Sequence, residues 1–203
     1  MRQVVIVSGS SRESSQSKKI SEYLQAELFK QEESVVANIV DLAKTKLPEW
    51  DEAIWHQGIG FNATWQNVSE QLKKADGFII VSPEWHGMVP AILKNFFLLC
   101  SSEELFHKPA LLVSVSSGQG GAYPIAELRM SSYKNNRICY LPEHLIIRYV
   151  ASVLNDFHKV ESEQDQVIRD RITYAISVLM VYIDGFKSIT EKLLVNKYFS
   201  SGM

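Results

Sequence analysis

The chain has 203 residues, which suits one globular domain with a substantial buried core. Apolar residues make up 46% and charged residues 22%, a composition typical of a folded soluble protein and unlike that of a disordered one. The formal charge of −2 predicts neither nucleic acid nor a membrane as a partner. Two cysteines are too few for a disulfide scaffold, and the N-terminus has no signal-peptide pattern, so we expect a cytoplasmic protein.

Apolar runs of strand length alternate with helical patterns along the chain. Strands are predicted at 4–7, 35–40, 77–81, 110–115 and within 138–150. Helices are predicted from Ser17, over 62–74, from Pro90 to Cys100, over 123–133 and from about Glu161. The last helix carries an apolar face that can cover a sheet, but its longest apolar stretch, 176–183, is shorter than the roughly 20 residues of a membrane span.

This alternation predicts an α/β fold, a doubly wound five-stranded parallel sheet flanked by helices on both faces. We expect a single domain over residues 1–203, with a C-terminal helical extension from about residue 186. In such folds, ligands bind beyond the carboxyl ends of the strands. Three distinctive loops follow strands at that edge, at 8–17, 82–87 and 116–121. The sequence therefore predicts one composite site there.

The loop after the first strand, SGSSRESSQS at 8–17, is rich in hydroxyl groups and carries Arg12. Its backbone N–H groups and the N-terminus of the next helix supply positive dipole, so we interpret it as a phosphate pocket. It lacks the lysine of a nucleotide-hydrolysing P-loop and the glycines of a dinucleotide fingerprint. The alternative is a polar turn in which Ser17 caps the helix.

The other two loops offer a place for a flat ligand. In SPEWHG at 82–87, Trp85 suits stacking on a planar ring, although a core position is an equally good interpretation. Glu84 and His86 are also compatible with an acid/base pair or with metal ligation, but two ligands make a poor metal site. The loop SSGQGG at 116–121 has little side-chain bulk, so a flat ligand can approach its backbone.

Together, these segments resemble the NADPH-dependent FMN reductases of flavodoxin-like fold, a group that includes chromate, quinone and azo-dye reductases. The matching segments are SGSSRESSQS at 8–17, KKADGFIIVSPEWHGMVPAILKNFF at 73–97 and KPALLVSVSSGQGGAYPIAELR at 108–129. They span most of residues 4–150 in the expected order. The signature ADG…PE[YW][HN]G…P…LKN is specific, whereas the glycine-rich loop alone is a weak signal.

The resemblance implies cofactor-binding roles for residues of all three loops. The FMN phosphate is held by Ser10, Arg12, Ser15 and Ser17. The isoalloxazine ring is lined by Pro83, Glu84, Trp85, His86 and Gly87. Its other side is bordered by Ser116, Ser117, Gly118, Gln119, Gly120 and Gly121. Because the cofactor carries the difficult chemistry, we expect no catalytic side chain and no metal ligand.

The implied activity is that of an FMN-dependent NAD(P)H oxidoreductase with a ping-pong mechanism. Hydride passes from NADPH (or NADH) to FMN, and the flavin then reduces a small-molecule acceptor such as a quinone, an azo compound, a metal oxyanion or free flavin. One alternative is a flavodoxin-like electron carrier that does not use nicotinamide, although such carriers are usually strongly acidic. Another is a binding or regulatory protein whose flavin site has degenerated.

Two apolar surfaces bear on the oligomer, which the resemblance implies is a homodimer or homotetramer. Phe96, Phe97 and Leu98 follow LKN, where the family often has a small residue and an aspartate, on a helix that commonly lies near the subunit interface. On the last helix, a second face that includes Val178 and Val181 suggests further burial, between subunits.

A long connection at 41–65 carries three tryptophans and a histidine, Trp50, Trp55, Trp65 and His56. We interpret it either as a lid or acceptor pocket near the flavin edge, or as a surface loop anchored by its tryptophans.

Overall fold

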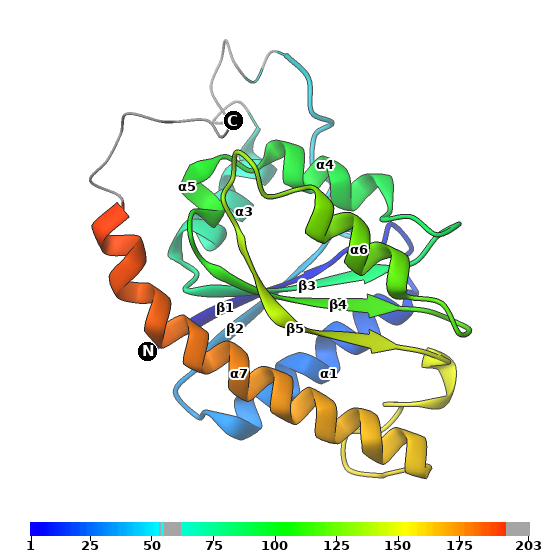
Figure 1. Cartoon of the computed structure of the whole chain (residues 1–203). Coiled ribbons are helices and arrows are strands. Elements are labelled where there is room, and N and C mark those ends of the chain that lie inside the picture. Colours follow the sequence, from blue (N-terminus) through cyan, green and yellow to red (C-terminus); the bar gives the residue numbers. More distant parts are fainter. Residues whose placement is uncertain (53, 55–61, 194–203) are drawn as a thin grey trace.

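The computed structural model describes residues 1–52, 54 and 62–193. Its sheet contains β1 (Gln3–Ser8), β2 (Val36–Asp41), β3 (Gly77–Pro83), β4 (Pro109–Val115) and β5 (Cys139–Ile147). Every neighbouring pair is parallel, and the order across the sheet is β2-β1-β3-β4-β5. The predicted five-stranded parallel sheet is confirmed (Figure 1).

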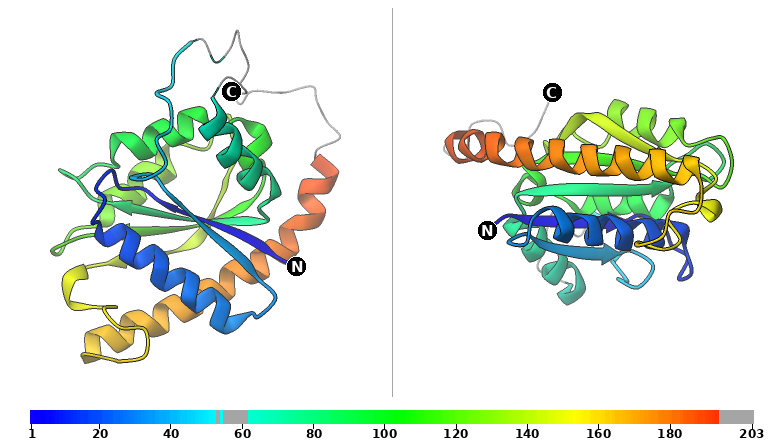
Figure 2. Two further views of the ribbon diagram at one scale, coloured as in Figure 1. Left: turned by 180° about the vertical axis from the view of Figure 1, so that it is seen from behind. Right: turned by 90° about the horizontal axis from the view of Figure 1, so that it is seen from below.

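Helices cover both faces of this sheet (Figure 2). The described helices are α1 (Gln16–Gln31), α3 (Ala63–Lys74), α4 (Ala91–Leu99), α5 (Ser102–Leu105), α6 (Ala122–Met130) and α7 (Glu163–Leu193), with a 3₁₀ turn at Val150–Ser152. One core cluster lies between the sheet and α1 with α7, and a second joins the sheet to α3, α4 and α6. The sequence did not predict α5, a single turn closed by a capping box between Ser101 and Glu104.

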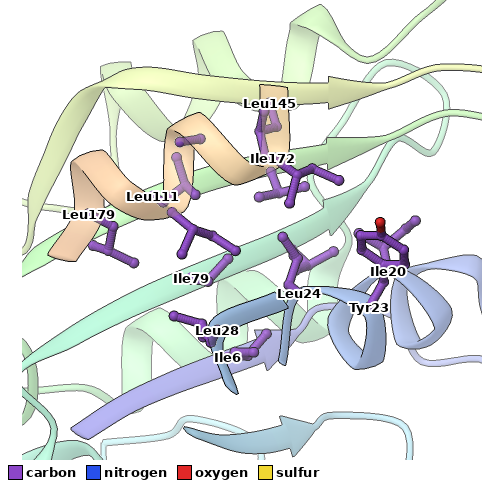
Figure 3. Close-up of a cluster of buried hydrophobic side chains, with 14 of the residues drawn as sticks. Ile6, Ile20, Tyr23, Leu24, Leu28, Ile79, Leu111, Leu145, Ile172 and Leu179 are labelled. Atoms are coloured by element: carbon purple, nitrogen blue, oxygen red, sulfur yellow. The ribbon is translucent and has the colours of Figure 1, made fainter. Parts of the chain in front are cut away.

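The burial of the elements follows from their apolar patterns. Every residue of β3 and β4 is buried, because these strands are covered on both faces. The predicted face of α1, with Ile20, Leu24 and Leu28, is fully buried against the sheet and α7. Figure 3 shows these side chains packed in one layer with those of α7 and the strands.

The last helix, α7, has 31 residues and is long and apolar enough, by length and composition, to cross a membrane. In the structure it covers the sheet as predicted, and its buried face includes Ile172, Ile176 and Leu179. The opposite face leaves Val181 70% exposed. Residues 186–193 continue the same helix.

The connection at 41–65 is partly described. Trp65 is fully buried on α3, and its ring centroid lies 6.5 Å from that of Phe96 on α4. Asn95 holds the start of the connection, because its Oδ1 accepts from Trp50 N at 2.8 Å and its Nδ2 donates to Pro48 O at 2.9 Å. Trp65 is therefore a core residue. Trp55 and His56 lie outside the described residues.

Candidate functional site

The three predicted loops meet at the carboxyl edge of the sheet, beyond the arrowheads of β1, β3 and β4 (Figure 1). Backbone contacts join them in the order of the strands. Gly9 N donates to Val81 O at 2.8 Å, and Glu84 N donates to Val115 O at 3.0 Å. The carboxylate of Glu84 then accepts from Gly121 N. The structure thus brings the predicted loops into one site.

The first loop passes close over β3 and ends in the N-cap of α1. A Cβ at Gly9 would lie 2.7 Å from Val81 O, so this close approach requires glycine. Ser15 is the N-cap, and its Oγ accepts from Lys18 N at 3.1 Å. The alternative in which Ser17 caps the helix is wrong, because Ser17 is already the second helical residue.

The first loop also leaves polar groups without protein partners. Ser10 is buried, and its Oγ accepts from Arg12 N at 3.2 Å. Arg12 is exposed, and its guanidinium forms no ion pair within the described residues. Ser17 is 1% exposed, and its Oγ has no hydrogen-bond partner in the part of the chain described. An arginine and a buried hydroxyl without a partner at a helix N-terminus fit a phosphate group.

The second loop is a tight turn that leaves an aromatic residue partly exposed. Trp85 N donates to Met88 O at 3.1 Å, and Met88 N donates to Trp85 O at 2.9 Å. The two residues between them, His86 and Gly87, have positive φ values of 51° and 72°. Trp85 is 36% exposed, so the alternative of a core tryptophan is wrong. Pro83, before the turn, is buried at the end of β3.

A carboxylate supports this turn from α6. Glu127 accepts from Val89 N at 2.7 Å and pairs with Lys94 Nζ at 2.6 Å. Burial alone would raise the pKa of Glu127, but these two partners hold it below its ordinary value. A hollow of about 450 Å³ beside this pair, between α4 and α6, has no predicted site residue in its lining.

The third loop combines open space with close packing. Ser116 and Gly118 are half-buried, while Ser117, Gln119 and Gly120 are exposed. No described atom lies within 4 Å of a Cβ placed at Gly118, whereas one at Gly120 would lie 2.9 Å from Glu84 Oε1. Gly121 is the N-cap of α6 and has a φ of 102°. A planar ligand can approach the backbone at Gly118, while Gly120 and Gly121 fix the path of the loop.

Two residues at this edge were missed by sequence reasoning. Arg148 follows the last residue of β5, and its Nε donates to Gln119 O at 2.7 Å and to Gly120 O at 3.0 Å. Tyr149 N donates to Gly118 O at 3.2 Å. A signal was present, because the fifth strand ends at this edge like the others. The fifth strand was predicted only to lie within 138–150, so the residues that follow its last position could not be identified.

The described residues contain no group of three or more His, Cys, Asp or Glu side chains arranged to hold a metal ion. Glu84, one of the two candidate ligands, is instead engaged with Gly121 N.

Several known proteins are similar to this chain. An NADPH azoreductase of Bacillus sp. (strain OY1-2) is 23% identical over 190 residues, which cover 94% of this chain and 97% of that protein. A quinone reductase of Escherichia coli (strain K12) is 39% identical over 80 residues, covering 37% of this chain and 42% of that protein. An FMN-dependent NADPH-azoreductase of Staphylococcus saprophyticus is 26% identical over 127 residues, which cover 62% of this chain and 66% of that protein.

Solved structures share the fold. The flavoenzyme FerB of Paracoccus denitrificans, an NAD(P)H:(acceptor) oxidoreductase, matches with a TM-score of 0.68 and 17% identity over 92% of this chain and 99% of that one. An NADH:FMN oxidoreductase (EMOB) matches with a TM-score of 0.71 and 16% identity over 94% of both chains. These likenesses confirm the flavodoxin-like α/β fold.

The family model described as NADPH-dependent FMN reductase matches residues 1–151, which contain all three loops. The predicted resemblance is therefore confirmed. The chain belongs to the NADPH-dependent FMN reductase family, enzymes whose cofactors are FMN and a nicotinamide nucleotide.

Proposed function

We propose that this reductase binds FMN at the carboxyl edge of β1, β3 and β4, with the phosphate in the first loop. The observation that carries this proposal is Ser17, whose buried Oγ has no partner within the described residues although it lies in the first turn of α1. A buried hydroxyl without a partner is costly, so a phosphate oxygen at this position would satisfy it. Arg12, Ser10 and Ser15 of the same loop would supply the remaining contacts.

The isoalloxazine ring would lie between the second and third loops. The exposed ring of Trp85 supports this placement on one side, and the open space at Gly118 supports it on the other. Pro83, Glu84, His86 and Gly87 would line the same pocket through the tight turn and its contact with Gly121. The protein's part is to hold and orient the ring, since bound FMN supplies hydride acceptance from NAD(P)H and electron delivery to an acceptor.

The second substrate in this proposal is a flat, redox-active small molecule. Relatives named as azoreductases and a quinone reductase favour azo compounds and quinones over metal oxyanions. Because Trp85 and the third loop are open to solvent, nicotinamide and acceptor can use one ring face in turn. We therefore propose ping-pong kinetics, which predict parallel double-reciprocal plots when NADPH is varied at several quinone concentrations.

One preparation tests the proposal. The purified protein is loaded with FMN, freed of excess cofactor and mixed anaerobically with NADPH. Rapid loss of the visible flavin absorbance is expected. Retained FMN that NADPH does not bleach would favour the electron carrier, and no FMN uptake would refute both functions.

The Arg12→Ala variant tests the phosphate assignment. Loss of a charge-assisted contact, worth about 1.5–3 kcal/mol, should weaken FMN binding by about 10- to 150-fold. Arg171→Ala is the matched control, because that exposed arginine pairs with Glu143. Equal FMN affinity in the two variants would refute the assignment.

We also propose that two copies of the chain pair through α7 to form the homodimer unit. The solvent-facing stripe of α7 includes Val167, Tyr174, Val181 and Ile189, which are 57%, 54%, 70% and 41% exposed. An antiparallel pair of α7 helices centred between residues 177 and 178 would match Tyr174 with Val181 of the second copy and place Val167 within one residue of Ile189. The same register would bring Glu163 near Lys192, so the stripe is complementary to itself.

Light scattering after size exclusion tests this interface. Val181→Glu should convert the dimer to monomer, because it places two charges in the paired stripe. Leu98→Glu is the matched control, since Leu98 is 59% exposed on α4. A monomeric wild type, or dissociation by Leu98→Glu alone, would refute pairing through α7.

A further inference from the structure

We propose that Arg148 is a positioning residue for the flavin, which acts by orienting the backbone N–H group of Gly120 toward the ring. This inference rests on the proposed FMN site. Arg148 belongs to none of the three loops, and it lies beyond the carboxyl end of β5. Its side chain makes a specific contact, since one N–H, that of Nε, is shared between Gln119 O at 2.7 Å and Gly120 O at 3.0 Å.

Three successive carbonyl groups of the third loop are held from the β5 side. Arg148 Nε donates to the carbonyl oxygens of Gln119 and Gly120, and Tyr149 N donates to that of Gly118 at 3.2 Å. The base of the loop is tied to the same strand end, because Ser116 N donates to Ile147 O at 2.9 Å. The direction of these peptide groups is therefore set by β5 and the residues that follow it.

The opposite ends of these peptide groups are the donors. In a trans peptide, the C=O of one residue and the N–H of the next point in opposite directions, and the described residues contain no cis peptide. Holding the carbonyls of residues 118–120 toward β5 thus turns the N–H groups of residues 119–121 away from it. Gly121 shows where they point, because its N–H donates to Glu84 on the loop after β3.

Two of these donors remain available. The N–H of Gly121 is used by Glu84, but those of Gln119 and Gly120 have no hydrogen-bond partner among the residues described. They face the side on which Trp85 and Glu84 lie, the side assigned to the isoalloxazine ring. Fixed N–H dipoles aimed at the edge of a ring that gains negative charge on reduction favour its reduced form over its oxidised form. Of the two free donors, Tyr149 fixes that of Gln119 through Gly118 O, and Arg148 fixes that of Gly120 through Gln119 O. Arg148 therefore affects the potential of the flavin without touching it.

Arg148→Met and Arg148→Lys test this role, with Arg129→Met as the matched control. Arg129 makes the same kind of contact elsewhere, since its Nη2 donates to Leu141 O at 2.5 Å and to Pro142 O at 3.1 Å at the start of β5. The readouts are the dissociation constant of FMN and the two-electron midpoint potential of the bound cofactor. Thermal unfolding of the FMN-free proteins reports whether each variant folds.

Arg148→Met should weaken FMN about tenfold and lower its midpoint potential by about 30 mV, which corresponds to a further tenfold loss of preference for the reduced form. Arg148→Lys, which keeps a donor and the charge, should restore part of both effects, and Arg129→Met should change neither.

Two outcomes would overturn the inference while leaving the proposed function intact. In the first, the midpoint potential of Arg148→Met equals that of the wild type, even if FMN binds more weakly. In the second, Arg129→Met shifts the midpoint potential as much as Arg148→Met does. Failure of the wild type to bind FMN would instead refute the proposed function.

Discussion

Replacing Ser17 by alanine should have opposite effects on the FMN-free protein and on FMN binding. Ser17 is 1% exposed, and its Oγ has no partner in the described part of the chain, so the hydroxyl is a net cost to the folded apoprotein. Leaving a buried polar group unsatisfied costs about 1–3 kcal/mol. Ser17→Ala should therefore leave the free energy of unfolding of the apoprotein unchanged or raise it by up to that amount.

The same substitution should weaken FMN binding if the hydroxyl donates to the phosphate. A hydrogen bond to a charged group is worth about 1.5–3 kcal/mol, which predicts a dissociation constant about 10- to 150-fold higher. Urea unfolding of the apoprotein and fluorescence titration with FMN measure the two quantities separately.

Ser21→Ala is the control, one turn further along α1. Ser21 is also buried, but its Oγ donates to Ser17 O at 2.9 Å. This variant should lose stability, by about 1 kcal/mol, and keep its affinity for FMN. Unchanged FMN affinity in Ser17→Ala, or equal losses of affinity in the two variants, would refute the argument from the unpaired hydroxyl.

Three further predictions concern stability. Burial lowers the pKa of Lys108 to about 8, so between pH 8 and 10.5 the unfolded chain binds more protons at this residue than the folded protein does. The free energy of unfolding of the wild type, measured with urea, should therefore rise by about 2 kcal/mol relative to that of Lys108→Met from pH 7.5 to 9.5. Gly121→Ala should lower stability by about 1–3 kcal/mol in thermal unfolding, because φ is 102° and a Cβ would lie 2.5 Å from Ile146. Arg169→Met should lower the free energy of unfolding in urea by about 3–5 kcal/mol, because it leaves the buried carboxylate of Asp165 without its cationic partner. Unchanged stability in this variant would contradict the argument.

Most of the fold follows from local patterns. Strands β3 and β4 are buried along their whole length, so their apolar runs could be recognised without knowledge of their neighbours. The apolar face of α1 predicted its contact with the sheet for the same reason. The short helix α5 could not be predicted in this way, because four residues are too few to show a period and its stability comes from a capping box.

The candidate site was predictable where it depends on loop composition and not where it depends on tertiary contacts. Glycines and hydroxyls after β1 and β4 identified two loops, and the proline and glycine of SPEWHG identified the third. The choice between Ser15 and Ser17 as helix cap depends on where α1 begins, which sequence patterns locate only within a few residues. Arg148 is 28 residues from Gly120, and only the pairing of β4 with β5 brings them together.

The order of the strands explains why one edge can hold a cofactor rigidly. Each loop is fastened to the strand or loop beside it: Gly9 to Val81, Glu84 to Val115 and Gly121, and Arg148 to Gly120. These contacts run across β1, β3, β4 and β5 in the order in which the strands lie in the sheet. Because loops fixed in this way need little ordering when a ligand binds, the conformational entropy cost of binding is low. A loop displaced at one strand would therefore affect the loop at the next, which is why a residue after β5 can influence a ring held between the loops of β3 and β4.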